Sequence, residues 1–214
     1  MKGKKVFYIA LFFSLIAILY GCNERNSRAY LEDRIGNQIS RVYPTKNLEN
    51  LFEQFPNGFT IYQSHTEGEY RIKVELIGDP ITRMIEGTIK KVRRKNGEVT
   101  SQVEVKYQNE EFSFSDEKLA TELWGYKKFL FQEMKIDKDV MSSLKLKDKS
   151  YNPKNGSFEI EYSIQNSGLN QFFELDESEV LDISFHGSNS NVGYYYTVAV
   201  RNKTGLEFKE RVYE

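Results

Sequence analysis

The stretch KKVRRKNGEVTSQVEVKYQ, residues 90–108, is the strongest indication of the fold in this chain. Asn96 and Gly97 separate two segments of strand-forming residues, and Asn-Gly is the pair that a two-residue hairpin turn prefers. The apolar residues of the second segment share one face of an extended chain: Val99, Val103, Val105 and Tyr107. This period of two predicts an antiparallel hairpin with one buried face and one solvated face.

Similar strand patterns occur on both sides of this hairpin. We expect strands over residues 59–63, 70–77, 81–95, 98–108, 112–114, 157–164, 180–185, 192–201 and 206–212. Turns that contain Gly, Asn or Ser join most of these segments, which favours hairpins over parallel crossover connections.

Helical patterns interrupt the strands. Residues 29–42 place apolar side chains near one helix face, and Pro44 ends that helix. Residues 48–55 predict a second helix, which Thr45 or Asn47 can cap. The strongest helical stripe lies further along the chain: Leu119, Leu123, Tyr126, Leu130 and Met134. Short helices are expected over residues 138–144 and 168–175.

Together these patterns predict an α+β fold. We expect an antiparallel sheet of hairpins and meanders, with N-terminal helices and a central helix packed on it. Residues 29–214 are enough for one domain of this kind. A division into two lobes near residue 150 is the alternative.

The first 22 residues, MKGKKVFYIALFFSLIAILYGC, have the pattern of a secretory signal peptide. A basic head precedes an apolar run of about 15 residues, shorter than the ~20 that span a bilayer. The end of the run, Leu-x-Gly-Cys, resembles the lipobox of bacterial lipoproteins. That resemblance implies cleavage between Gly21 and Cys22 and a diacylglyceryl group on the Cys22 sulfur. An uncleaved signal anchor is the alternative.

Cys22 is the only cysteine of the chain, so an anchor there leaves no thiol for a disulfide. Two acyl chains hold a protein stably at a membrane, whereas one chain does so only marginally. Residues 22–28 are then a lipidated tether, and the expected location is the outer side of the bacterial cell membrane.

The charge of the processed chain argues against one class of partner. Removing 21 of the 214 residues, three of them lysines, leaves 27 basic and 31 acidic residues and a net charge of −4. A protein that binds nucleic acid over its whole surface is strongly basic. We therefore expect no nucleic-acid partner.

Three stretches in order resemble the staphylococcal tandem lipoproteins. Residues 42–52, VYPTKNLENLF, are similar to the YPxKNLEDLY segment of that family. Residues 150–153, SYNP, and 162–166, YSIQN, are similar to its SYNP…YxLxN segment. The resemblance covers about residues 20–212. The family usually has a stretch ending in Gly-Thr-Trp after its YPxKNLEDLY helix, and the shorter residues 54–61 lack it here.

This resemblance implies a surface lipoprotein whose biochemical activity is unknown. The family is linked with virulence, with host-cell entry and with recognition by innate immune receptors through the lipid. On that basis we expect a non-enzymatic protein that contacts a host protein, an envelope protein or an anionic polymer. The alternative is an accessory lipoprotein that binds a ligand in a pocket.

Residues that could carry catalysis or bind a metal are few. The chain has two histidines, His65 and His186, and it lacks the Gly-x-Ser-x-Gly, His-Glu-x-x-His and phosphate-loop motifs. We expect no catalytic residue, no metal and no cofactor. His65 beside two glutamates fits a solvated turn better than a metal site. The same holds for the acidic cluster Asp176, Glu177, Glu179 and Asp182, which lacks the spacing of a calcium loop.

Five basic residues lie at the tip of the quoted hairpin: Lys90, Lys91, Arg93, Arg94 and Lys95. One interpretation is a solvated hairpin whose charge discourages aggregation through strand edges. The other is an anion contact with a lipid headgroup, a wall polymer, a glycosaminoglycan or an acidic protein surface. The run Tyr194–Tyr196 fits packing within a sheet better than an interface.

Overall fold

Ten antiparallel strands form one continuous sheet in the computed structural model, which describes residues 24–188 and 195–214. Gly21, Cys22, Tyr194 and the start of the expected strand at 192 lie outside these residues. The strands of the first half are β1 (Phe59–Glu67), β2 (Tyr70–Gly78), β3 (Ile85–Arg93), β4 (Val99–Gln108) and β5 (Glu111–Phe114). Those of the second half are β6 (Lys145–Tyr151), β7 (Ser157–Ile164), β8 (Leu181–Ser188), β9 (Tyr195–Arg201) and β10 (Glu207–Tyr213).

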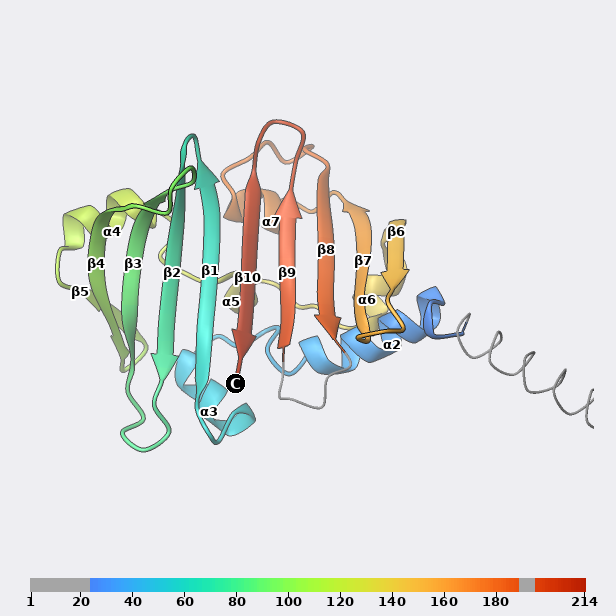
Figure 1. Cartoon of the computed structure of the whole chain (residues 1–214), viewed down its shortest axis with the longest axis horizontal. Coiled ribbons are helices and arrows are strands. Elements are labelled where there is room, and N and C mark those ends of the chain that lie inside the picture. The colour runs from blue at the N-terminus through green and yellow to red at the C-terminus, as the bar shows by residue number, and fades with distance from the viewer. Residues whose placement is uncertain (1–23, 189–194) are drawn as a thin grey trace, which may run out of the picture.

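Two meanders meet in the middle of this sheet. The strand order is β5-β4-β3-β2-β1-β10-β9-β8-β7-β6, so the first and last strands pair with each other (Figure 1). Their register runs from Thr60 opposite Tyr213 to His65 opposite Phe208. The two halves of the chain therefore share one hydrogen-bonded ladder.

The helices leave one face of the sheet uncovered, which is the face seen in Figure 1. They are α2 (Arg28–Ile39), the 3₁₀ helix η1 (Leu48–Asn50), α3 (Leu51–Gln54), α4 (Glu117–Leu123), α5 (Leu130–Glu133), α6 (Lys138–Ser143) and α7 (Ser167–Phe172). The expected α+β fold with an antiparallel sheet and N-terminal helices is confirmed.

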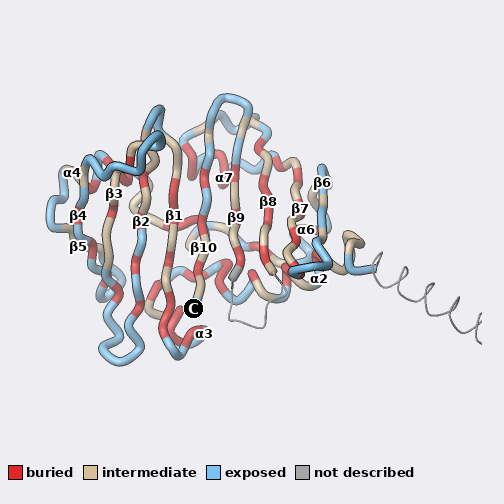
Figure 2. Tube along the Cα trace, in the orientation of Figure 1, coloured by how far each residue is buried: buried red, intermediate tan, exposed pale blue. Residues whose placement is uncertain are grey.

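Alternation along the strands explains why the helices pack on one face only. In β7, Phe158, Ile160, Tyr162 and Ile164 are buried, whereas the residues between them are partly exposed. Figure 2 shows the same alternation across the sheet. The apolar face needs a cover, and the polar face is stable in water without one.

The single central helix predicted over the stripe from Leu119 to Met134 is wrong. The chain forms two short helices, α4 and α5, and Lys127 between them adopts a left-handed backbone with φ of 45°. The physical reason is Glu210 of β10, because its carboxylate accepts the backbone N–H groups of Leu130 and Phe131. A continuous helix would direct those N–H groups to carbonyls four residues earlier.

Strand β6 was not expected from the sequence. Its residues KLKDKSY show no apolar alternation, and it lies at an edge of the sheet. Edge strands commonly carry lysines, because charge discourages pairing with a second molecule. The helix expected over residues 48–55 is shorter than predicted, being one 3₁₀ turn and one α turn. Asn47 caps that 3₁₀ turn, as one of the two expected caps, by accepting the Glu49 N–H at 2.8 Å.

Candidate functional site

The uncovered side of the sheet, called the open face here, is a broad polar surface. In β1 it carries Thr60, Tyr62, Ser64 and Thr66, and the other strands add the residues in register with these four. Most of its positions are exposed or half-buried. Open polar faces of this kind are available to a partner without any rearrangement of the fold.

Three lysines extend across the centre of the open face. Lys90 of β3 lies opposite Lys73 of β2, Lys73 lies opposite Ser64 of β1, and Ser64 lies opposite Lys209 of β10. We call Lys90, Lys73 and Lys209 the lysine row. Arg71 lies two residues from Lys73 in β2 and therefore shares the face. Within residues 24–188 and 195–214, none of these four side chains has a carboxylate within 4.0 Å.

Three other basic residues of the open face have acidic partners. Lys147 lies 2.9 Å from Glu161 and 2.6 Å from Asp182, and Arg201 also pairs with Glu161. Nearer the first half, Lys106 lies 3.8 Å from Glu86. These ion pairs therefore neutralise part of the positive charge elsewhere on the face.

Aromatic rings adjoin the lysine row. The guanidinium of Arg211 lies 4.9 Å from the centre of the Tyr62 ring and 4.8 Å from that of Tyr213. A guanidinium over a ring is attracted by the negative charge of the π face. Arg211 is held in this position on the open face beside Lys209.

The five basic residues of the hairpin tip do not form one surface. Lys90 faces the open side, whereas Lys91 points to the other side and lies 3.3 Å from Glu67. Arg93 pairs with Glu98 at 2.8 Å, and a hydrogen bond to Tyr70, followed by the charge of Glu98, raises its pKa. The other two, Arg94 and Lys95, are exposed in the turn, where Arg94 lies 3.7 Å from Glu207.

Strand alternation and local ion pairs together explain this division. A strand directs successive side chains to opposite faces, so consecutive basic residues cannot all contact one ligand. Glutamates from the neighbouring turn and strands then neutralise three of the five charges.

His65 packs against Tyr126 at 5.3 Å between ring centres. Burial lowers the pKa of His65, and the charge of Glu67 opposes that shift in part. Among the described residues there is no group of three His, Cys, Asp or Glu that could hold a metal ion.

A serine–histidine contact was missed in the sequence. Ser184 Oγ lies 3.0 Å from Nε2 of His186, and Glu159 lies 3.5 Å from the same nitrogen. The spacing of two in a strand places Ser184 and His186 on one face, which was the available indication. Burial lowers the pKa of His186, with the charge of Glu159 acting in the opposite direction.

This contact lacks the geometry of a hydrolase triad. In a triad the acid binds the other ring nitrogen, so that the histidine can relay a proton from the serine. Strand β8 is also paired on both sides, which commits its backbone N–H groups to the sheet rather than to an oxyanion.

The acidic segment from Asp176 to Asp182 is tied into the fold. The buried amide of Asn170 donates to the carbonyl oxygens of Asp176, Glu177 and Glu179 at 3.0, 3.0 and 2.9 Å. The Asp176 carboxylate accepts from Ser178, and Asp182 pairs with Lys147. These contacts account for the cluster without an ion.

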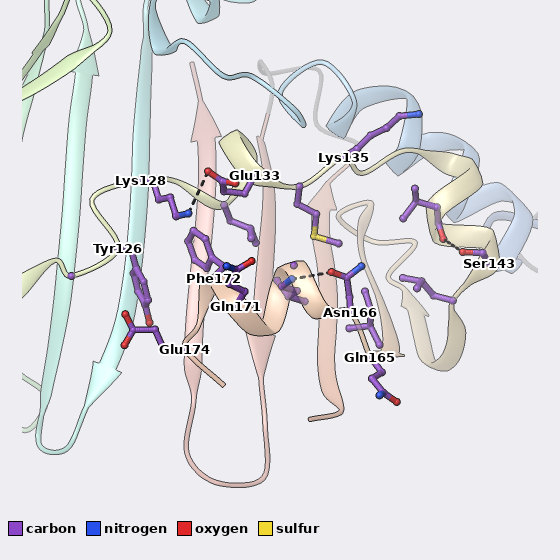
Figure 3. Close-up of a pocket in the computed structure, with 18 residues that line it drawn as sticks. Tyr126, Lys128, Glu133, Lys135, Ser143, Gln165, Asn166, Gln171, Phe172 and Glu174 are labelled. Atoms are coloured by element: carbon purple, nitrogen blue, oxygen red, sulfur yellow. Dashed lines mark hydrogen bonds and ion pairs between the residues drawn. The ribbon is translucent and has the colours of Figure 1, made fainter. Parts of the chain in front are cut away.

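A cleft of about 850 Å³ opens between α5, α6 and α7 on the helical side (Figure 3). Leu130, Leu169 and Phe172 supply apolar surface, and Lys128 with Glu133 forms a 3.4 Å ion pair at its rim. Its volume lies in the range of small-molecule sites.

The most perturbed carboxylate, Glu210, lies in the core. It accepts hydrogen bonds from Tyr43 at 2.8 Å, Gln63 at 2.9 Å, and the backbones of Leu130 at 2.7 Å and Phe131 at 2.9 Å. Burial raises its pKa to about 7, although these hydrogen bonds oppose the shift. Since Glu210 is fully buried and does not line the cleft, we assign it a structural role.

Comparison with known proteins found no family model that matches this chain and no similar curated protein. In the part of the chain that the structure describes, no helix combines the length and the apolar composition needed to cross a bilayer.

Proposed function

We propose that this chain is a lipid-anchored, non-enzymatic interaction protein on the outer side of a bacterial cell membrane, of the tandem lipoprotein type. The observation that carries the proposal is the open face, a polar surface ten strands wide that none of the described helices covers. The signal pattern that ends at Cys22 supports the anchor.

The proposed arrangement divides the work between lipid and protein. Two acyl chains on Cys22 hold the molecule in the membrane. The tether of residues 22–28 leads into α2, and the sheet beyond it presents the open face to a host or envelope partner.

The anchor is tested by Cys22→Ser in cells, with Asn23→Ser as the matched control. The parent and the control should take up an alkyne-tagged fatty acid and lose residues 1–21, as read by mass spectrometry. Cys22→Ser should remain unlabelled and keep the signal. Labelling of the Cys22→Ser protein would refute the anchor at this residue.

The interaction is tested with the complete protein inserted into lipid vesicles. Vesicles that carry it should adhere to host cells more than empty vesicles do, and salt should weaken adhesion because the open face is charged. Equal adhesion of loaded and empty vesicles would argue against host contact by the folded part.

The cleft between α5, α6 and α7 favours a second candidate, a ligand-binding accessory lipoprotein. Native mass spectrometry of the protein extracted from its membrane should then show a bound small molecule. Gly168→Trp, which places a large ring at the cleft, should release it. An unoccupied cleft in the parent protein under these conditions would remove this candidate.

A further inference from the structure

We propose that the lysine row, together with Arg71, binds a linear sulfated polysaccharide. This site deepens the proposed function, and it rests on that function because the open face must point away from the membrane. Its parts come from β3, β2 and β10, and no single segment of the sequence contains them.

The first argument is charge repulsion within the free protein. Lys73 and Lys90 are directly opposite in an antiparallel pair, and like charges in that position destabilise a sheet. In the described part of the chain neither lysine has an acidic partner within 4.0 Å. A bound anion between them would remove this repulsion.

The second argument is the local charge balance. Arg71, Lys73, Lys90 and Lys209 carry four positive charges, and Glu75 beside Lys73 carries the nearest negative charge along β2. With Glu207, which lies two residues before Lys209 on the same face of β10, these groups leave a net charge of about +2 on a molecule that is acidic overall after signal removal. Lys106, Lys147 and Arg201 on the same face already have carboxylate partners. An anionic ligand is therefore attracted more strongly to this region than to theirs.

The third argument concerns the shape of the ligand. Lys90 and Lys209 are three strand spacings apart, or about 14 Å at ~4.8 Å per strand. A single phosphate or sulfate group cannot contact both ends of that row. Ser64, in the middle of the row, is short and buried, so the surface between the lysines suits an extended chain with regularly spaced charges.

The composition of the row favours a polysaccharide over a protein partner. Protein interfaces are depleted in lysine and are centred on buried apolar or aromatic anchors. The large exposed apolar residues of the described chain are Ile77, Ile81, Met84, Val99 and Val180, none of which belongs to the row. Flexible ammonium groups are suited to sulfate groups that vary in position along a chain.

The test uses the complete chain purified in detergent, with heparin as the probe and neutral dextran as the uncharged comparison. The row variant is Lys73→Ser, Lys90→Ser and Lys209→Ser. The matched control is Lys118→Ser, Lys154→Ser and Lys203→Ser, which removes the same charge from exposed lysines outside the row. Circular dichroism establishes that both variants keep the fold of the parent.

We expect the parent protein to bind heparin and not dextran, with an affinity that falls steeply as salt rises. At ~0.1 M salt the row variant should bind about 100-fold more weakly, since each lysine near an anionic surface contributes roughly fivefold. The control should stay within about threefold of the parent, because its lysines lie outside the contact.

Three results would overturn the assignment. The row variant could bind like the parent, or lose no more affinity than the control. A hairpin-tip variant with Lys91, Arg93, Arg94 and Lys95 changed to Ser could lose binding while the row variant keeps it. The parent could also fail to bind heparin although its vesicles adhere to host cells. That last result would leave the proposed function standing and exclude a sulfated polysaccharide as the partner.

Discussion

The carboxylate of Glu210 connects β10 to three other parts of the chain. Tyr43 comes from the N-terminal segment, Gln63 from β1, and Leu130 and Phe131 from α5. Gln63 extends the network, because its amide oxygen accepts the indole N–H of Trp124 at 2.6 Å. Removing the carboxylate would leave several buried donors without a partner, which is among the most destabilising changes a core can suffer.

Titration of Glu210 should make stability depend on pH. Its folded pKa of about 7 lies above the ordinary value of 4.5, so between these values the native state binds more protons than the unfolded chain. The free energy of unfolding should therefore fall as pH rises from 4.5 to 7, by about 3 kcal/mol from this group. The effect should level off above pH ~8.

Glu210→Gln isolates this contribution, because the variant keeps every other titrating group. His65 and His186 have lowered pKa values and act in the opposite direction, since their unfolded forms gain a proton at a higher pH than their folded forms do. Urea unfolding at several pH values should show the advantage of the parent over Glu210→Gln growing from pH 8 to pH 5. A difference that is constant across this range would contradict the prediction.

At the scale of single elements, the crossing of α2 and α6 depends on a glycine. A Cβ atom on Gly36 would lie 2.5 Å from the backbone nitrogen of Lys138 and 2.7 Å from its Cα. A glycine inside a helix ordinarily weakens it, but Gly36 permits close contact of two helices.

Gly36→Ala should therefore destabilise the protein despite the better helix propensity of alanine. Crowding of backbone atoms typically costs about 1–3 kcal/mol, and the propensity gain of about 1 kcal/mol offsets only part of it. Gly125→Ala is the control, because no atom lies within 4 Å of its added Cβ. Urea unfolding should show a lower midpoint for Gly36→Ala alone, and equal midpoints would refute the steric argument.

Edge strand β6 should be sensitive to the loss of charge. Lys145 is exposed there and has no acidic partner within 4.0 Å among the residues described. Lys145→Ile should promote association through the free edge, detected as light scattering during refolding. Lys154→Ile, in the turn before β7, should scatter much less. Equal scattering by both variants would show that apolarity alone, and not the strand edge, is responsible.

At the scale of the whole molecule, the N-terminal segment joins the two halves of the sheet. Glu32 of α2 accepts a hydrogen bond from Tyr162 of β7 at 2.8 Å. The same segment reaches the first half, where Leu48 donates its backbone N–H to Tyr107 of β4 at 3.4 Å. The β1–β10 ladder and the Glu210 network add a second connection.

We therefore expect both halves to unfold together rather than as lobes that separate near residue 150. Hydrogen exchange at the amides of β2 and β8 should report the same free energy of opening, because each half loses its shared ladder when the other unfolds. Unfolding followed by fluorescence of Trp124, the only tryptophan, should coincide with that followed by circular dichroism. Lower protection throughout one half would show that the lobes are independent.

Short-range patterns determined much of the architecture by themselves. The alternation of Val103, Val105 and Tyr107 predicted a strand with one buried face, and the Asn-Gly pair predicted its hairpin. Val99, which the same pattern placed on that face, is exposed, because the pairing of β3 with β4 shifts its register between Lys91 and Val92. These features are visible in the sequence because the groups that interact are close along the chain or repeat with a fixed period. The fold class followed from them, and the signal pattern ending at Cys22 supports a lipid anchor that remains a prediction.

Only the tertiary structure decided where distant residues meet. The break between α4 and α5 depends on Glu210, about 80 residues away, so the helical stripe alone predicted one long helix. The basic residues of the hairpin tip do not act as one surface, because neighbouring glutamates pair with three of them. The lysine row, in contrast, is formed by residues of three strands that the sheet places side by side. Strand order and register bring these groups together, and both are set by contacts that no local window of sequence contains.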